Sequence, residues 1–216
     1  MTPGPDVLYQ CPKCNNYIYN ESFMSGNTCG ASLFSDRKRI APMLPDFPNL
    51  TKCKKCGEFL WLNKMKAIGY FGMYGNQNLS DLIGDADKHP DKAEFPTIDD
   101  YFEALKNKAF TEKNDEIFIR VRIWWEFNDR ARGGGELFRG DDDEVRYLDN
   151  LATLINLLDE NNLDEKITLA EVYRNLGDFD KCAEIIGSID DPKMEWLKMA
   201  FLNECGQENK MVFQLR

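Results

Sequence analysis

The 216-residue chain has little that would support histidine-based catalysis or a passage through a membrane. It has one histidine, His89, so no second imidazole can serve as a catalytic base or a metal ligand. No apolar run approaches about 18 residues, which predicts that no transmembrane helix forms. A basic segment followed by an apolar one is missing from the first residues. We therefore expect no secretory signal and a cytoplasmic location.

Positive charge is also scarce, since 27 Lys/Arg stand against 37 Asp/Glu, for a net charge of −10. The imbalance is uneven, because residues 1–75 hold nine basic and five acidic side chains. A chain this acidic repels nucleic acid and anionic membranes at long range. We therefore expect no membrane partner, and nucleic acid only at the N-terminal third. Hydrophobic residues make up 43%, which is enough for a folded core.

The seven cysteines are an odd number, and their spacing favours a metal site in a reducing compartment over a disulfide framework. Four of them form two CxxC pairs, which are Cys11-Pro-Lys-Cys14 and Cys53-Lys-Lys-Cys56. With two residues between the cysteines, a tight turn lets both thiolates reach one ion. Such a turn requires a left-handed residue directly after the second cysteine. Asn15 and Gly57 occupy these positions and tolerate that conformation.

Together the pairs predict one metal site with the ligands Cys11, Cys14, Cys53 and Cys56. Four sulfurs at about 2.3 Å suit a structural zinc ion, with rubredoxin-like iron as the alternative. Four thiolates leave no open position for water or substrate, so the ion is expected to stabilise a small sheet. The 38 residues between the pairs exceed the roughly 15–20 of a common zinc ribbon, which implies an insertion.

The chain divides by its periodicity into a β-rich and a helical part, which predicts an α+β fold. Turn-forming residues dominate residues 1–75, where short strand-like pieces at 17–19, 32–34 and 58–62 indicate a zinc-ribbon-like module. Residues 76–95 are expected to connect this module to an all-α, tetratricopeptide-like domain at 96–216.

Helix start and stop signals organise the helical part. Thr97 is a predicted N-cap, a helix is predicted over 115–132 before the glycines 133–135, and acids at 141–144 open the next helix.

The segment 167–186 resembles one tetratricopeptide unit. Leu169, Ala170 and Tyr173 match its first helix, Gly177 matches its turn, and Cys182 takes the place of a small residue. A plain helical hairpin bundle is the alternative.

Two weaker patterns point to other functions. Cys29, in a glycine-flanked turn, could be a nucleophile with His89 as its base, although a buried small side chain or a loop thiol explains it better. Lysines and aromatic residues around the second cysteine pair could bind single-stranded nucleic acid, with a solvated surface as the alternative. These residues are Lys52, Lys54, Lys55, Phe59, Trp61, Lys64 and Lys66.

Three segments and the second cysteine pair carry a resemblance to a known group. They are Ser25-Gly-Asn-Thr-Cys-Gly-Ala31, Ser35-Asp36 and Ala41-Pro-Met-Leu-Pro45, followed by Lys52-Cys-Lys-Lys-Cys56. Over about its first seventy residues the chain resembles uncharacterised bacterial proteins that join a ribbon-type N-terminus to a tetratricopeptide-like helical region. The resemblance implies a metal site and a cytoplasmic bacterial setting, and it carries no activity.

These observations predict a non-enzymatic, zinc-binding interaction or scaffold protein with a protein or peptide partner. Stacked helix pairs offer concave surfaces suited to such a partner. Nucleic-acid binding through the basic ribbon is one alternative, and an enzyme that uses Cys29 is another. The sequence assigns no oligomeric state.

Overall fold

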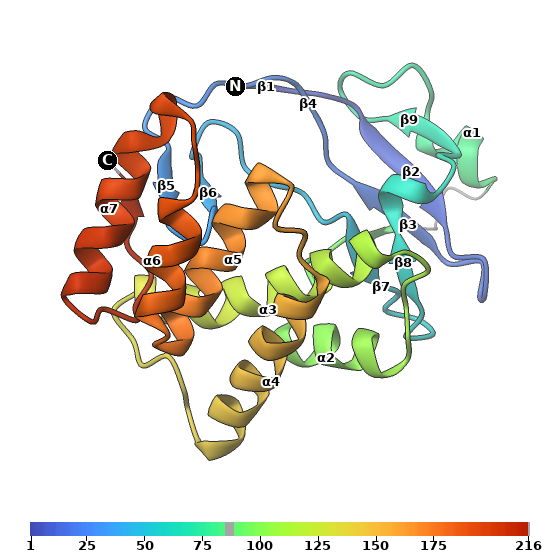
Figure 1. The fold of residues 1–216 in the computed structure, drawn as a ribbon. Coiled ribbons are helices and arrows are strands. Elements are labelled where there is room, and N and C mark those ends of the chain that lie inside the picture. Colours follow the sequence, from blue (N-terminus) through green and yellow to red (C-terminus); the bar gives the residue numbers. More distant parts are fainter. Residues whose placement is uncertain (85–88, 216) are drawn as a thin grey trace. The chain divides into compact units, whose positions relative to one another are not determined.

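The structure is a computed structural model that describes residues 1–84 and 89–215, and its contacts divide the chain into two units (Figure 1). The first unit comprises Met1–Ala31 and Ala41–Ala104, and the second comprises Ser32–Ile40 and the chain from Leu105 onward. Strands and helices together confirm the α+β prediction. The expected connection at 76–95 includes residues 85–88, which lie outside the described residues.

The first unit contains three small sheets made of short strands. Its strands are β1 (Thr2–Pro3), β2 (Asp6–Gln10), β3 (Tyr17–Asn20), β4 (Phe23–Ser25), β7 (Leu50–Lys52), β8 (Phe59–Trp61), β9 (Gly69–Phe71) and β10 (Asp91–Lys92). The largest sheet has the order β10-β3-β2-β9, and the pairs β1-β4 and β7-β8 form the other two. Only the β10–β3 pair is parallel among these described strands. The strands expected at 17–19 and 58–62 are confirmed as β3 and β8.

One cluster in this unit joins apolar side chains to cysteines. Its buried members are Cys11, Ile18, Cys53, Leu60, Leu62 and Ala93. Burial of its three large aliphatic side chains contributes roughly 1.5–3 kcal/mol each, and Leu8 and Leu50 are fully buried in the same unit. The two buried cysteines place the predicted metal site inside this core.

Short helices complete the first unit, namely η1 (Leu62–Lys64), α1 (Leu79–Ile83) and the start of α2 (Ile98–Lys106). The Thr97 prediction is confirmed, because its Oγ1 accepts a hydrogen bond from the Asp100 backbone N–H at 3.2 Å. The Asp100 carboxylate in turn accepts one from the Thr97 backbone N–H at 3.0 Å. This reciprocal pair satisfies backbone donors that a helix start leaves open.

Helices form most of the second unit, which confirms that the C-terminal part is helical. They are α3 (Lys113–Arg132), α4 (Asp141–Leu157), α5 (Leu163–Leu176), α6 (Phe179–Gly187), η2 (Pro192–Met194) and α7 (Glu195–Gly206). The helix expected over 115–132 corresponds to α3, which ends at Arg132 with Gly133 as its C-cap. The predicted start at residue 141 is the first residue of α4.

The segment compared with a tetratricopeptide unit folds as the helical hairpin α5–α6. Gly177 lies between the helices with a φ of 87°, a left-handed conformation that glycine adopts without steric cost. Cys182 is fully buried in the cluster that α5, α6 and α7 share, where a small side chain lets helices approach closely. The tetratricopeptide character itself stays a prediction.

A β-hairpin from the N-terminal third belongs to the second unit. It consists of β5 (Ser32–Phe34) and β6 (Arg39–Ile40), and β5 also pairs with β11 (Gln214–Leu215) near the end of the chain. The strand expected at 32–34 is confirmed as β5, yet it lies with the helices and not with the other predicted strands. The first unit is therefore interrupted by a segment of the second.

Buried polar side chains attach this hairpin to α5. Ser35 donates a hydrogen bond to Glu171 at 2.7 Å, and its Oγ accepts one from the Phe213 backbone N–H at 3.1 Å. Arg174 forms a bidentate ion pair with Glu171 at 2.6 and 2.8 Å. Arg174 also donates to the Met211 carbonyl at 2.9 Å. All of Glu171 and Arg174 is buried, so this ion pair connects three segments that lie far apart in the sequence.

A second buried carboxylate holds the turn of the hairpin. Asp36 accepts hydrogen bonds from Asn128 at 2.9 Å and from Arg132 at 2.7 Å, and both donors lie on α3. Its backbone carbonyl accepts a hydrogen bond from the Trp125 indole at 2.9 Å. Buried charges are stable only when they are paired and hydrogen-bonded, and Asp36 meets both conditions.

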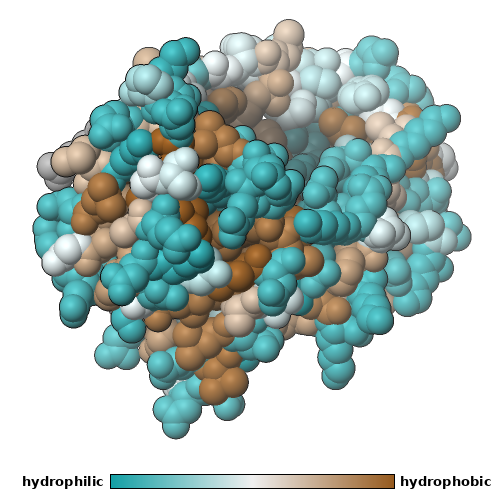
Figure 2. Space-filling view, in the orientation of Figure 1, coloured by the Kyte–Doolittle hydropathy of each residue, from teal (hydrophilic) through white to brown (hydrophobic). Residues whose placement is uncertain are grey.

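The outer face of α4 is partly apolar. Val145 is 66% exposed and Leu148 is 42% exposed, and Figure 2 shows hydrophobic atoms over the lower end of this helix. Scattered apolar residues of this kind are normal on a protein surface. Among the described residues, no helix combines the length and the apolar character that a membrane crossing requires.

Candidate metal centre

The four predicted cysteine ligands lie together in the first unit. Their sulfur atoms are all within 4.8 Å of one another, although the two pairs are far apart in the sequence. The Sγ atoms of Cys11 and Cys56 are 3.6 Å apart, and so are those of Cys14 and Cys53. A tetrahedron with metal–sulfur bonds of about 2.3 Å has sulfur–sulfur edges of about 3.8 Å. The cluster therefore has the size of a four-thiolate metal site, and all four cysteines are free of disulfides.

The two cysteine pairs form equivalent backbone turns. The N–H of Asn15 donates to the Cys11 carbonyl at 2.9 Å, and that of Gly57 donates to the Cys53 carbonyl at 2.8 Å. Asn15 has a φ of 58° and Gly57 a φ of 75°, which confirms the left-handed residue predicted after each pair. This matching geometry aims each pair of thiols at a common point.

Short strands lead into and out of both turns. After Cys11, the chain returns through Asn16, whose carbonyl accepts a hydrogen bond from the Cys11 N–H at 2.8 Å. At the second turn the Cys53 N–H donates to the Glu58 carbonyl at the same distance. The hairpins β2–β3 and β7–β8 thus fix the two turns by ordinary ladder hydrogen bonds.

The pKa values of the cysteine thiols shift in different directions, because the surroundings of each thiol differ. Burial raises the pKa of the Cys11 thiol and raises the pKa of Cys14 to about 12. A hydrogen bond from the Glu58 backbone N–H lowers the pKa of Cys56 to about 7. Backbone N–H groups that point at sulfur stabilise the thiolate, which is the form that binds a metal.

Polar side chains around the cluster connect its two halves. Lys13 of the first turn forms an ion pair with Glu58, next to the second turn, at 2.9 Å. Asn16 donates to the Asp91 carboxylate at 2.7 Å and approaches the Cys53 sulfur at 4.0 Å. Sequence reasoning missed Asn16 and Asp91, because nothing in the local pattern shows that β10 lies beside β3.

The cluster is closed as well as compact. Cys11 and Cys53 are buried, and Cys14 and Cys56 are half-buried. With four sulfur donors in place, a tetrahedral ion has no position left for a water molecule or a substrate. The arrangement can therefore hold a metal ion and stabilise the surrounding strands.

Acidic neighbours offset the lysines near the second turn. Lys52 forms ion pairs with Asp100 at 2.8 Å and with Glu103 at 2.7 Å, and Lys54 forms one with Glu94 at 2.7 Å. Lys64 lies over the Trp61 ring, 5.6 Å from its centroid. The structure thus places Lys52 over Phe59 and Lys64 over Trp61, and it pairs Lys52 and Lys54 with carboxylates.

The weaker catalytic candidate is the pair of Cys29 and His89. Cys29 is exposed in the turn that follows β4, where its backbone N–H donates to the Asn27 side chain at 3.0 Å. His89 is exposed as well. No contact between these two side chains is found in the described part of the chain.

The chain was compared with protein-family models, with curated proteins and with solved structures, and no match was found in any of the three comparisons. The resemblance to bacterial ribbon proteins accordingly stays a prediction, while the clustered cysteines and the helical C-terminal part stand as structural findings.

Proposed function

We propose that this chain is a non-enzymatic protein in which a structural zinc ion holds the first unit in shape for binding a protein partner. The observation that carries the proposal is the closed set of four sulfur atoms within 4.8 Å of one another. A thiolate-saturated ion contributes to folding and not to bond chemistry. The burial of Cys11 and Cys53 supports this role, because an ion bound to them would connect the two cysteine turns inside the apolar cluster.

Zinc is preferred over iron on chemical grounds. Both ions accept four thiolates in tetrahedral geometry, but zinc needs no redox partner. Metal analysis of the purified full-length protein tests this part, with one zinc ion per chain and zinc–sulfur distances of about 2.3 Å as the expected result. If the analysis finds one iron ion per chain with ferric–thiolate absorption, the ion in the proposal is iron and not zinc. A chain without any bound metal would remove the proposal itself.

Nucleic-acid binding through the basic ribbon is the second candidate, and the Lys64–Trp61 contact is the observation that favours it. The carboxylates beside Lys52 and Lys54 weaken it, because they reduce the positive charge available to phosphates. Gel-shift titrations with single-stranded DNA and RNA across a salt series test this candidate. Binding that falls steeply as salt rises would support it, and no binding at low salt would eliminate it.

A further inference from the structure

A cavity in the first unit lies apart from the cysteines and has no assigned role. It has a volume of about 610 Å³, within the roughly 300–1,000 Å³ of ligand pockets. Its walls come from the start of β2, the β3–β4 turn, the proline-rich stretch before β7, and the chain from β10 to α2. Sequence reasoning did not find it, because these segments meet only in the folded unit.

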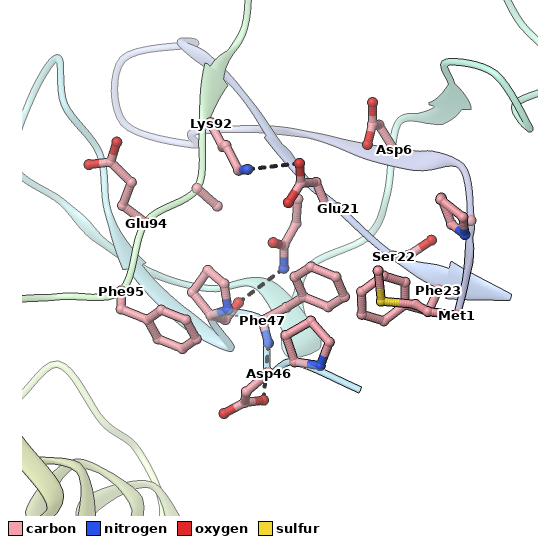
Figure 3. Close-up of a pocket in the computed structure, with 16 residues that line it drawn as sticks. Met1, Asp6, Glu21, Ser22, Phe23, Asp46, Phe47, Lys92, Glu94 and Phe95 are labelled. Carbon is pink, nitrogen blue, oxygen red and sulfur yellow. Dashed lines mark hydrogen bonds and ion pairs between the residues drawn. The ribbon is translucent and has the colours of Figure 1, made fainter. Parts of the chain in front are cut away.

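The floor and sides of the cavity are largely apolar. Phe23 and Phe47 pack against each other with ring centroids 4.8 Å apart, and Phe95 is 43% exposed beside them (Figure 3). Pro45 and Pro48 contribute further apolar walls. Aromatic and proline walls of this kind bind the aliphatic parts of a ligand through burial of apolar area.

The rim of the cavity is acidic. Figure 3 shows Glu94, Glu21, Asp6 and Asp46 spread around the aromatic rings. Lys92 forms an ion pair with Glu21 at 2.7 Å, and outside the lining Lys54 does so with Glu94. The four lining carboxylates outnumber the three ammonium groups beside them, which are Lys92, Lys54 and the N-terminus of Met1, so the rim stays negative. Both ion pairs are largely exposed to solvent, so they exchange with other cations at little cost.

Asp6 is the carboxylate that most favours an additional cation. Burial and the nearby negative charge of Glu21 raise its pKa, and the ammonium of Lys92 offsets only part of this rise. In the described part of the chain no hydrogen-bond donor reaches its oxygen atoms. A cationic group between Asp6 and Glu21 would relieve the repulsion between the two carboxylates.

We infer that this cavity binds a basic, extended peptide segment of a partner protein, whose Arg or Lys side chains reach the rim while apolar side chains contact the phenylalanines. Anionic ligands, including nucleic acid and phospholipid head groups, are repelled by the rim. A peptide suits the site better than a small amine does, because the carboxylates are spread around the cavity and a single small cation meets few of them. This inference rests on the proposed function, since it names the chemistry of the partner.

The metal site supports the walls of this cavity. β3 runs from the first cysteine turn to Asn20, and Asn20 donates to the Pro48 carbonyl at 3.1 Å. β7 runs from that proline segment to Cys53, and Thr51 on β7 donates to the Glu94 carbonyl at 2.8 Å. Both sides of the cavity are therefore continuous with the turns that carry the sulfur atoms.

Fluorescence anisotropy of the full-length, metal-loaded protein tests the inference. The probe is a fluorescein-labelled (Arg-Leu)₃ peptide, with (Gln-Leu)₃ and (Glu-Leu)₃ as comparison peptides. We expect the arginine peptide to bind at least about tenfold more tightly than the glutamine peptide, with an affinity that falls as salt rises. Equal binding of the two, no binding of the arginine peptide, or its displacement by an equal concentration of spermidine would overturn the inference.

Variants then locate the binding. The double variant Asp6→Asn with Glu21→Gln is expected to lower the affinity for the arginine peptide by about fivefold or more. It removes two negative charges from the rim and leaves Lys92 without its ion-pair partner. The matched control is Asp190→Asn with Glu160→Gln, which changes the net charge equally at exposed acids that do not line the cavity. Equal effects of the two double variants would show only long-range attraction and would contradict the cavity assignment.

A second variant tests the apolar contact. Phe95→Ala shortens a side chain that is already 43% exposed, so the fold is expected to survive, and binding is expected to weaken severalfold. Met73→Ala, at a residue that is 89% exposed and outside the cavity lining, is the control. Unchanged binding by Phe95→Ala would exclude the aromatic wall from the site.

Metal content, measured on the same samples, separates this inference from the proposed function. A chain that holds one zinc ion and binds no probe contradicts the cavity assignment alone. A chain that holds no metal contradicts the proposed function, whatever the peptides do.

Discussion

The buried clusters of the two units differ in composition. The first has a cluster of six buried apolar residues, and two of these are the cysteines Cys11 and Cys53. The second has a cluster of ten, continuous across α5, α6 and α7, and a buried ion pair that is hydrogen-bonded to Ser35 after β5 and to Met211 before β11. If the four cysteines bind an ion as proposed, one chain combines a unit that a metal ion stabilises with a unit that apolar burial stabilises.

The largest effect is expected from replacing a cysteine of the metal centre, and it should be confined to the first unit. Cys53→Ser removes one of four ligands, and structural zinc binding is worth roughly 10–16 kcal/mol in small zinc-binding peptides. We expect loss of bound zinc and loss of cooperative unfolding in the first unit, measured by metal analysis and by hydrogen exchange of β2, β3, β7 and β8. Cys29→Ser, at an exposed cysteine outside the cluster, should change neither. Zinc retention by Cys53→Ser at the wild-type level would show that the cluster is not the metal site.

The second unit offers a comparison between two ion pairs of the same spacing. Glu171 and Arg174 are fully buried, whereas on α6 Lys181 is partly exposed and Glu184 is largely exposed. Glu171→Gln leaves a buried guanidinium without its counter-charge and is expected to cost about 3–5 kcal/mol in the free energy of unfolding. Glu184→Gln should cost less than about 1 kcal/mol. Chemical denaturation measures both, and similar costs would contradict the role assigned to the buried pair.

A smaller effect is expected at the start of α4. The Arg139 backbone N–H and the Arg130 guanidinium, the latter at 2.6 Å, hold the pKa of the Asp143 carboxyl below its ordinary 3.8. A lowered folded-state pKa contributes stability above about pH 4, and this stability is lost as the pH falls through the folded-state value. Asp143→Asn should therefore destabilise the unit by about 1–2 kcal/mol at neutral pH, and the difference from wild type should shrink in acid.

Asp142→Asn is the control for this position. Asp142 lies in the same first turn and meets the same helix dipole, and it is exposed. Thermal unfolding of both variants between neutral and acidic pH gives the comparison. A difference between Asp143→Asn and wild type that does not change with pH would argue against the ion pair as its source.

The smallest effect is expected at the surface of the metal centre. Lys13 and Glu58 join the two cysteine turns at 2.9 Å, but their side chains are 61% and 41% exposed. Lys13→Gln should change the stability of the first unit only slightly, because the pair is solvent-screened, and should leave its zinc content unchanged. Loss of zinc in this variant would mean that the turns are held by charge more than by sulfur coordination.

Local sequence patterns predicted the parts of the structure that depend on local geometry. The CxxC spacing with Asn15 and Gly57 defines each turn by itself, and the cap at Thr97 defines the start of α2. The helix ending at Arg132 follows from its own periodicity and stop signal. Each of these features requires contacts over only a few residues.

Features that depend on contacts between distant segments could not be predicted from the sequence. Ser35 and Phe213 are 178 positions apart and exchange hydrogen bonds, so no window of sequence shows that β5 belongs with the helices. From the sequence, Glu171 and Arg174 look like an ordinary ion pair on a helix surface. Their burial depends on the distant segments that cover them, and the local sequence does not show those. The cavity likewise depends on four segments, and its acids and phenylalanines are scattered along the first hundred residues.

Hydrogen exchange of the metal-loaded and the chelator-treated full-length protein tests the account most directly. Removal of the ion should raise exchange throughout the strands of the first unit, β2, β3, β7 and β8, while α3, α5 and α6 keep their protection. Unchanged protection of those strands in protein shown to have lost its metal would contradict the claim that sulfur-bound metal stabilises the first unit.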